Sequence, residues 1–130
     1  MIVDSSALIA VIQREEDAVA LADVLVGTEA CFISAANYFE AAIVADKERN
    51  PVTSRRFDEL CASIELKVVP VDEAQARIAR EAYRDFGKGS GHKARLNFGD
   101  CFAYALAKAM NEPLLYKGTD FSQTDVRPAL

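Results

Sequence analysis

The chain opens with the stretch Met1-Ile2-Val3-Asp4-Ser5-Ser6-Ala7-Leu8-Ile9-Ala10-Val11-Ile12. The apolar run before Asp4 predicts a short buried strand, and the apolar positions after Ser6 predict a helix. A strand that leads directly into a helix is typical of a fold with a parallel sheet. Ligands bind such sheets beyond the carboxyl ends of the strands, so Asp4 lies where a ligand is expected.

The same alternation continues along the chain. We expect further strands at about 30–34, 67–71 and 114–116, and helices at about 15–26, 35–49, 52–64, 72–86 and 97–110. Short apolar strands that alternate with helices predict a three-layer α/β/α sandwich with a central parallel sheet. With 130 residues, of which 51% are hydrophobic, the chain suits a single domain over residues 1–130.

Cysteine content and hydropathy predict the cellular compartment of the protein. Cys31, Cys61 and Cys101 are odd in number and stand among apolar neighbours, which favours reduced, mostly buried thiols over disulfides or a zinc site. No run approaches the roughly 20 apolar residues of a membrane span, and the start lacks the basic region of a signal peptide. We therefore expect a cytoplasmic protein without a membrane anchor.

The net charge of −5 would by itself argue against a nucleic-acid partner. Basic residues nevertheless gather in the glycine-containing segment 87–97, as Lys88, His92, Lys93 and Arg95. An acidic protein with one basic loop is compatible with a polyanion docked at a metal, although a merely solvated, flexible loop explains the same residues.

Two acidic residues in the first third of the chain are candidates for a site. Asp4 follows the first strand, where it would also serve as a helix N-cap. Glu40 belongs to the helix Ala35-Ala36-Asn37-Tyr38-Phe39-Glu40-Ala41-Ala42, which is apolar nearly all round and is expected to be largely buried. A buried charge there needs a cation, a basic side chain or a water-filled cleft. Asn37, three residues earlier, shares its side of the helix.

Two further acids lie near the end of the chain. Asp100 is in the first turn of a helix that Asn97 is expected to cap, so structure alone could explain it. Gly99 is unfavourable at such a helix start unless another group approaches it closely. Asp120 follows the last strand, where an ordinary turn aspartate is the alternative.

Together the four acids indicate a metal site. In a parallel sandwich Asp4, Glu40, Asp100 and Asp120 can converge, and gathered carboxylates repel one another unless a cation neutralises them. Oxygen ligands alone favour Mg²⁺ or Mn²⁺, whereas zinc would call for histidines and thiolates that this chain does not cluster.

Four ordered segments carry a family resemblance. They are MIVDSSAL (1–8), SAANYFEAA (34–42), FGKGSGHKARLNFGDCFAYALAK (86–108) and LLYKGTDFSQTDV (114–126). The chain resembles the PIN-domain family and, within it, the toxic ribonucleases of the VapBC toxin-antitoxin type. The resemblance implies a Mg²⁺-dependent endoribonuclease that cuts structured RNA such as a tRNA or a ribosomal RNA loop. It also implies a VapB-type antitoxin and a homodimer.

The resemblance also assigns roles to residues. Asp4, Glu40 and Asp100 match the family's metal-binding acids. Relatives often carry two acids before the phenylalanine of the last motif; here Thr119 stands in the first place and Asp120 in the second, so either could supply the fourth ligand. We expect Asp4 and Asp100 to hold Mg²⁺ directly, with Glu40 and Asp120 completing the shell through waters or binding a second ion. The metal is expected to activate a water for attack on the phosphodiester. The remaining expected residues are the supporting Ser6, Asn37, Asn97 and Thr119, and Lys88, Lys93 and Arg95 as phosphate contacts, with His92 in RNA contact or without a role.

Two rival interpretations remain at this point. A phosphotransfer aspartate protein would also place an aspartate after a strand, but a haloacid-dehalogenase-like phosphatase needs a second aspartate where Ser6 stands, and a receiver domain needs an acidic pair before Asp4. The other rival is a catalytically weak relative that only binds RNA or a protein.

Overall fold

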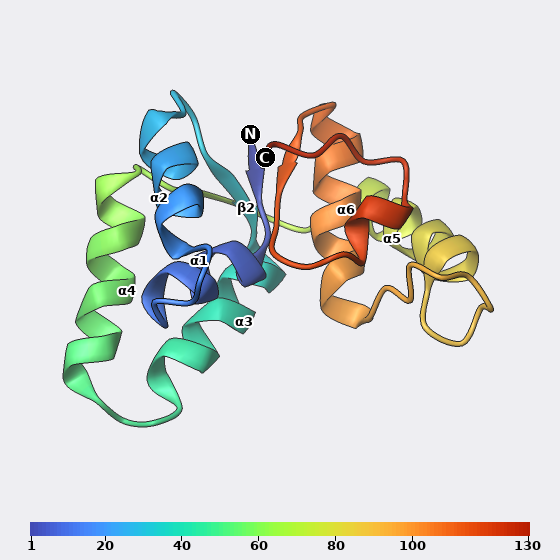
Figure 1. The fold of residues 1–130 in the computed structure, drawn as a ribbon. Coiled ribbons are helices and arrows are strands. Elements are labelled where there is room, and N and C mark those ends of the chain that lie inside the picture. Colours follow the sequence, from blue (N-terminus) through green and yellow to red (C-terminus); the bar gives the residue numbers. More distant parts are fainter.

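A parallel sheet of four short strands forms the centre of the protein, in the order β3-β2-β1-β4 (Figure 1). The structure is a computed structural model that describes all of residues 1–130. Every pair of neighbouring strands is parallel, as the sequence predicts. The strands are β1 (Ile2–Val3), β2 (Phe32–Ser34), β3 (Lys67–Val69) and β4 (Leu114–Leu115).

Helices cover both faces of this sheet. Four of them lie on one side and two on the other (Figure 1), so the expected three-layer α/β/α sandwich is confirmed. The first group consists of α1 (Ser5–Ile12), α2 (Ala18–Gly27), α3 (Ala35–Asp46) and α4 (Pro51–Ser63), and the second of α5 (Glu73–Phe86) and α6 (Phe98–Met110). A short 3-10 helix, η1 (Phe121–Gln123), follows β4.

Two helices are shorter than the sequence predicts. Helix α2 begins at Ala18 instead of about residue 15, because Arg14 has a left-handed backbone (φ 53°) that interrupts the helical path after α1. Helix α3 ends at Asp46 instead of Arg49, which is itself left-handed (φ 53°). At the start of α5, the Asp72 side chain accepts the amide of Gln75 at 2.8 Å, and the Gln75 side chain donates to the carbonyl of Pro70 instead of back to Asp72.

Two apolar cores lie on opposite faces of the sheet. Because successive strand residues point to opposite faces, even a two-residue strand contributes to both cores. Ile2 and Leu114 face the core under α5 and α6, whereas Val3 and Leu115 face the core under α1 to α4. The three cysteines are free thiols, with Cys31 and Cys101 buried and Cys61 half-buried. None of the helices has the length and apolar character needed to cross a lipid bilayer.

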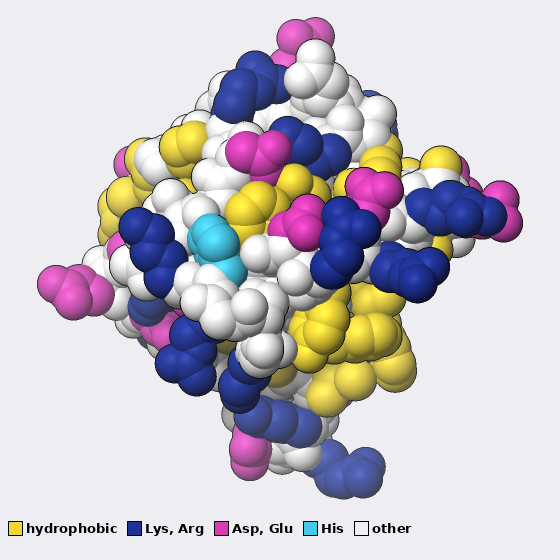
Figure 2. Space-filling view, turned by 90° about the vertical axis from the view of Figure 1, so that its right-hand side faces the viewer, with side chains coloured by type: hydrophobic (Ala, Val, Ile, Leu, Met, Phe, Trp, Pro, Cys, Tyr) yellow, Lys and Arg dark blue, Asp and Glu magenta, His cyan; other side chains and the backbone are white.

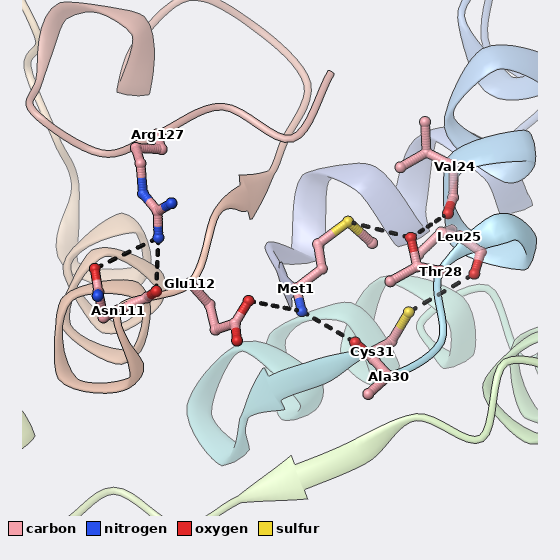
Figure 3. Close-up of polar contacts among 9 residues, drawn as sticks. All are labelled: Met1, Val24, Leu25, Thr28, Ala30, Cys31, Asn111, Glu112 and Arg127. Carbon is pink, nitrogen blue, oxygen red and sulfur yellow. Dashed lines mark hydrogen bonds and ion pairs between the residues drawn. The ribbon is translucent and has the colours of Figure 1, made fainter.

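Polar contacts close the amino end of the sheet (Figure 3). The terminal amine of Met1 donates to the carbonyl of Ala30 at 3.0 Å and pairs with Glu112 at 3.4 Å. On the neighbouring segment, Arg127 donates to the carbonyl of Asn111 at 2.6 Å. The Met1 contacts tie β1 to the segments before β2 and before β4 at the end opposite Asp4, and the Arg127 contact ties the C-terminal segment to the end of α6.

The core predicts where substitution destabilises the fold. Leu106 of α6 is completely buried, so Leu106→Ala should lower the free energy of unfolding by about 2–5 kcal/mol through lost burial and a residual cavity. Val19 of α2 is 74% exposed, so Val19→Ala should change it by no more than about 0.5 kcal/mol. Urea denaturation of the two variants measures both values, and equal losses would contradict this assignment of the core.

Candidate metal centre

Asp4 lies at the carboxyl end of the central strand β1. Its amide donates to the carbonyl of Leu115 at 2.9 Å, and its side chain is only 3% exposed. Oδ2 accepts the amide of Ser6 at 3.0 Å, so Asp4 is indeed the N-cap of α1. Its other carboxylate oxygen, Oδ1, is buried without a partner. The cap therefore accounts for one oxygen and leaves the other available to a ligand.

The protonation of Asp4 reflects this environment. Burial raises its pKa from 3.8 to about 7, against the lowering effect of the hydrogen bonds from Ser6. The negative charges of Asp100 and Glu40 raise it further. Asp4 thus shares an electrostatic environment with two of the other candidate acids, although all three come from different elements.

Asp100 stands in the first turn of α6. A capping box forms there as expected: the amide of Asp100 donates to Asn97 Oδ1 at 2.9 Å, and the amide of Asn97 donates to Asp100 Oδ2 at 3.0 Å. Burial is the largest cause of the raised pKa of Asp100, and the charges of Asp120 and Glu40 add to it. Because the box uses only Oδ2, the Oδ1 oxygen is available to a ligand.

Glu40 projects from α3 toward α1 and α6. Its Oε1 accepts a hydrogen bond from the Ser5 hydroxyl, and the Asn37 amide lies 3.4 Å from the same oxygen. The expectation that α3 is largely buried is wrong, because only one side of the helix meets the core and Phe39 and Ile43 are 65% and 48% exposed. Glu40 is half-buried, and its partners are a hydroxyl and an amide rather than a basic side chain.

The two candidates for the fourth metal ligand lie in the exposed turn before η1. Both Thr119 and Asp120 are exposed there. Of the two, Asp120 carries a charge that reaches Asp100 and raises its pKa. The structure records no hydrogen bond from the Thr119 side chain. This electrostatic effect on Asp100 makes Asp120 the better candidate for the fourth acid, while Thr119 remains the alternative.

Two residues that the sequence did not single out position these acids. Ser5 holds Glu40, as described above. Lys117, just after β4, forms ion pairs of 3.3 Å with both Glu15 and Asp17, and its amide donates to the Ser6 hydroxyl at 3.0 Å. These contacts fix the start of the turn that carries Thr119 and Asp120. Neither role has a local sequence signal, since the partners are far apart along the chain.

The acids are neighbours but do not form a ready-made chelate. No group of three carboxylate, histidine or thiol side chains is close enough to hold a metal ion as placed, so the expected convergence is looser than the sequence suggested. Carboxylates repel one another, and Asp4, Asp100 and Glu40 each accept hydrogen bonds from separate donors. The unpartnered Oδ1 of Asp4 and the purely oxygen donor set fit a hard divalent cation held in part through water.

The basic loop connects α5 to α6. Reciprocal backbone hydrogen bonds between 86–88 and Leu96 close its base. Lys88, Lys93 and Arg95 are exposed and form no ion pair. The ring of His92 packs edge-on against Phe86, and its Nδ1 accepts the amide of Ala94 at 3.0 Å, so His92 stabilises the loop. Figure 2 shows this single histidine on the surface with Lys and Arg side chains on either side of it.

A family model and several relatives agree on the family to which this chain is similar. A family model described as "PIN domain" matches residues 1–127. Ribonuclease VapC28 of Mycobacterium tuberculosis is 56% identical over 130 residues, which are 100% of this chain and 98% of that protein. Ribonuclease VapC42 of the same species is 46% identical over 129 residues (99% and 98%), and a ribonuclease VapC of Mycolicibacterium smegmatis is 43% identical over 126 residues (97% of each).

Two solved structures share the fold. The structure of Mycobacterium tuberculosis VapC20, described as a "Sarcin-Ricin loop cleaving toxin", has a TM-score of 0.70 at 14% identity and covers 98% of both chains. A toxin-antitoxin complex from Klebsiella pneumoniae has a TM-score of 0.69 at 16% identity, covering 93% of this chain and 89% of that one. Both are similar to this chain in architecture.

The burial of Asp4 predicts a pH dependence of stability in buffer containing EDTA. An acid whose pKa rises on folding from 3.8 to about 7 binds its proton more tightly in the folded state, so its contribution to stability falls as pH rises through that range. Asp4→Asn keeps a capping oxygen and removes the charge, and should stabilise the protein at pH 8 by on the order of a few kcal/mol. Below pH 4 the wild type and Asp4→Asn should have the same free energy of unfolding. Urea denaturation at pH 8 and below pH 4 measures the difference between them. A difference that does not change with pH would contradict this prediction.

Proposed function

The chain belongs to the PIN-domain family, whose VapC ribonucleases it matches over its whole length, and we propose that it cuts structured RNA at a divalent metal ion. The family is metal-dependent, and for this chain we propose Mg²⁺, with Mn²⁺ able to replace it. The observation that carries the proposal is the buried, unpartnered Oδ1 of Asp4 beside the charges of Asp100 and Glu40.

In this proposal Asp4 and Asp100 hold the ion directly through their unused oxygens. Glu40 and Asp120 complete the site through water. Ser6 and Asn97 orient the two direct ligands through the helix caps, and Ser5 and Asn37 orient Glu40. The bound ion supplies Lewis-acid activation of the attacking water and neutralises charge that develops on the phosphate. No histidine base is required, and the only histidine belongs to the basic loop.

The basic loop is proposed to hold the RNA backbone. Lys88, Lys93 and Arg95 are exposed and uncommitted, which leaves their charges free for phosphates. His92 either contacts RNA with the edge of its ring or serves only to stabilise the loop. Because proteins recognise RNA mainly through loops and unstacked bases, we propose a tRNA or a ribosomal RNA loop as the substrate class.

Partners follow from the same family. We propose that the chain is the toxin of a toxin-antitoxin pair, inhibited by a VapB-type antitoxin whose basic side chain enters the acidic pocket. A homodimer is also proposed, since Phe39, Ile43 and Phe98 offer exposed apolar surface for a partner subunit. Residues 1–130 would act as one nuclease domain in the cytoplasm, where its RNA substrates are found.

Sequencing of RNA ends after brief expression tests the proposed activity. The wild-type chain should generate new ends at one structured RNA site, and Asp100→Asn should generate none, because the metal loses a direct ligand. The variant should keep the wild-type circular dichroism spectrum, since asparagine preserves the hydrogen-bonding capacity of the cap.

Asp23→Asn is the matched control. Asp23 is an exposed aspartate of α2 with no recorded hydrogen bond, and its variant should cut like the wild type. Full cleavage by Asp100→Asn would contradict the metal site. Metal binding by the wild type without cleavage of any RNA would instead favour a PIN-like module that only binds.

The basic loop predicts salt-dependent binding. In the Asp100→Asn background, replacing Lys88, Lys93 and Arg95 together by alanine should weaken RNA binding and reduce the slope of log affinity against log salt by roughly 2–3, because fewer counterions are released. Fluorescence anisotropy over a salt series measures the slope. An unchanged slope would remove the loop from the RNA interface.

A further inference from the structure

We propose that Gly99 is a positioning residue: by having no side chain, it admits the Glu40 carboxylate between α1 and α6, and this placement sets the affinity for the divalent ion. The inference rests on the proposed metal site and extends it to a residue with no ligand atom in its side chain.

The Glu40 carboxylate lies against the backbone of Gly99. A Cβ built on Gly99 would lie 3.0 Å from Glu40 Cδ and closer still to Oε2, a separation that real Cβ atoms essentially never show. Glu40 is therefore the group that approaches Gly99 closely, as the sequence led us to expect. The φ angle of Gly99 is not in the left-handed region. The contact with Glu40 therefore requires a glycine at this position, and the backbone conformation does not.

Hydrogen bonds hold the Glu40 carboxylate in place against Gly99. Its Oε1 accepts a hydrogen bond from the hydroxyl of Ser5, whose side chain is buried. Asn37 is completely buried and donates to the same oxygen, Glu40 Oε1, and, at 2.9 Å, to the carbonyl of Gly99. Asn37 thus ties the helix that carries Glu40 to the start of α6, directly before Asp100.

A side chain at position 99 would have to displace one of two groups. The start of α6 is fixed by the capping box of Asn97 and Asp100 and by the Asn37 hydrogen bond, so the flexible Glu40 side chain should be the one to move. If the helix moved instead, Asp100 would move with it. Both responses separate Glu40 from Asp100 and weaken the ion site.

Helix propensity allows the contact between Gly99 and Glu40 to be tested by its effect on stability. Alanine is favoured over glycine within a helix, so Gly99→Ala would be expected to stabilise α6 if nothing lay against it. The sign of its effect on stability should therefore depend on Glu40. With Glu40 present the substitution should lower the melting temperature, and in a Glu40→Ala background it should raise it.

A double-mutant cycle on the full chain tests the proposal. The four proteins are wild type, Gly99→Ala, Glu40→Ala and the double variant, each assayed for Mn²⁺ affinity by calorimetry and for melting temperature in EDTA. Gly99→Ala alone should weaken Mn²⁺ binding about tenfold, the effect typical of disturbing a group that orients metal ligands. Added to Glu40→Ala, it should change the Mn²⁺ affinity by less than about twofold, because the displaced carboxylate is already gone.

Equal loss of Mn²⁺ affinity from Gly99→Ala in both backgrounds would overturn the proposal, as would no loss in the wild-type background. The same holds if the melting temperature moves in the same direction in both backgrounds. Absence of Mn²⁺ binding by the wild type is a different result: it would refute the proposed metal function itself and this inference with it.

Discussion

A carboxylate buried at the end of the central strand is the constraint around which the rest of the site is arranged. Asp4 continues the hydrogen bonding of the sheet to β4, so the register of the sheet determines its position. Only one of its oxygens has a donor, and the other is buried without one. Burial of such a charge is costly unless a proton or a cation compensates it. The other acids approach this point from α3, α6 and the turn after β4.

The same residues stabilise the fold and prepare the site. Asp4 caps α1, and Asp100 is the N3 partner in the capping box of α6; the N-terminal ends of both helices favour anions, and each of these contacts uses one carboxylate oxygen. The capping interpretation and the metal interpretation, which compete when the sequence is considered alone, are therefore compatible. A helix cap fixes the orientation of each carboxylate, and preorganised ligands bind a cation with less loss of conformational freedom.

Local patterns predicted much of this architecture. The order of strands and helices, the N-caps Asp4 and Asn97 and the close approach at Gly99 are each signalled by neighbouring residues. The sequence did not reveal that Ser5 binds Glu40 or that Lys117 pairs with Glu15 and Asp17, because these contacts join segments 35 to 102 residues apart. The exposure of Phe39 on α3 was also mispredicted, since the hydrophobicity of one helix does not show how many neighbours cover it.

The proposed site requires a divalent cation to bind between the strand that carries Asp4 and the helix that carries Asp100. Anomalous X-ray scattering from crystals soaked in Mn²⁺ tests it most directly. We expect a single strong peak within coordination distance of the Asp4 and Asp100 carboxylates, at roughly 2.0–2.3 Å from the nearest oxygens. A peak that avoids both residues, or none at Mn²⁺ concentrations that support RNA cleavage, would contradict it.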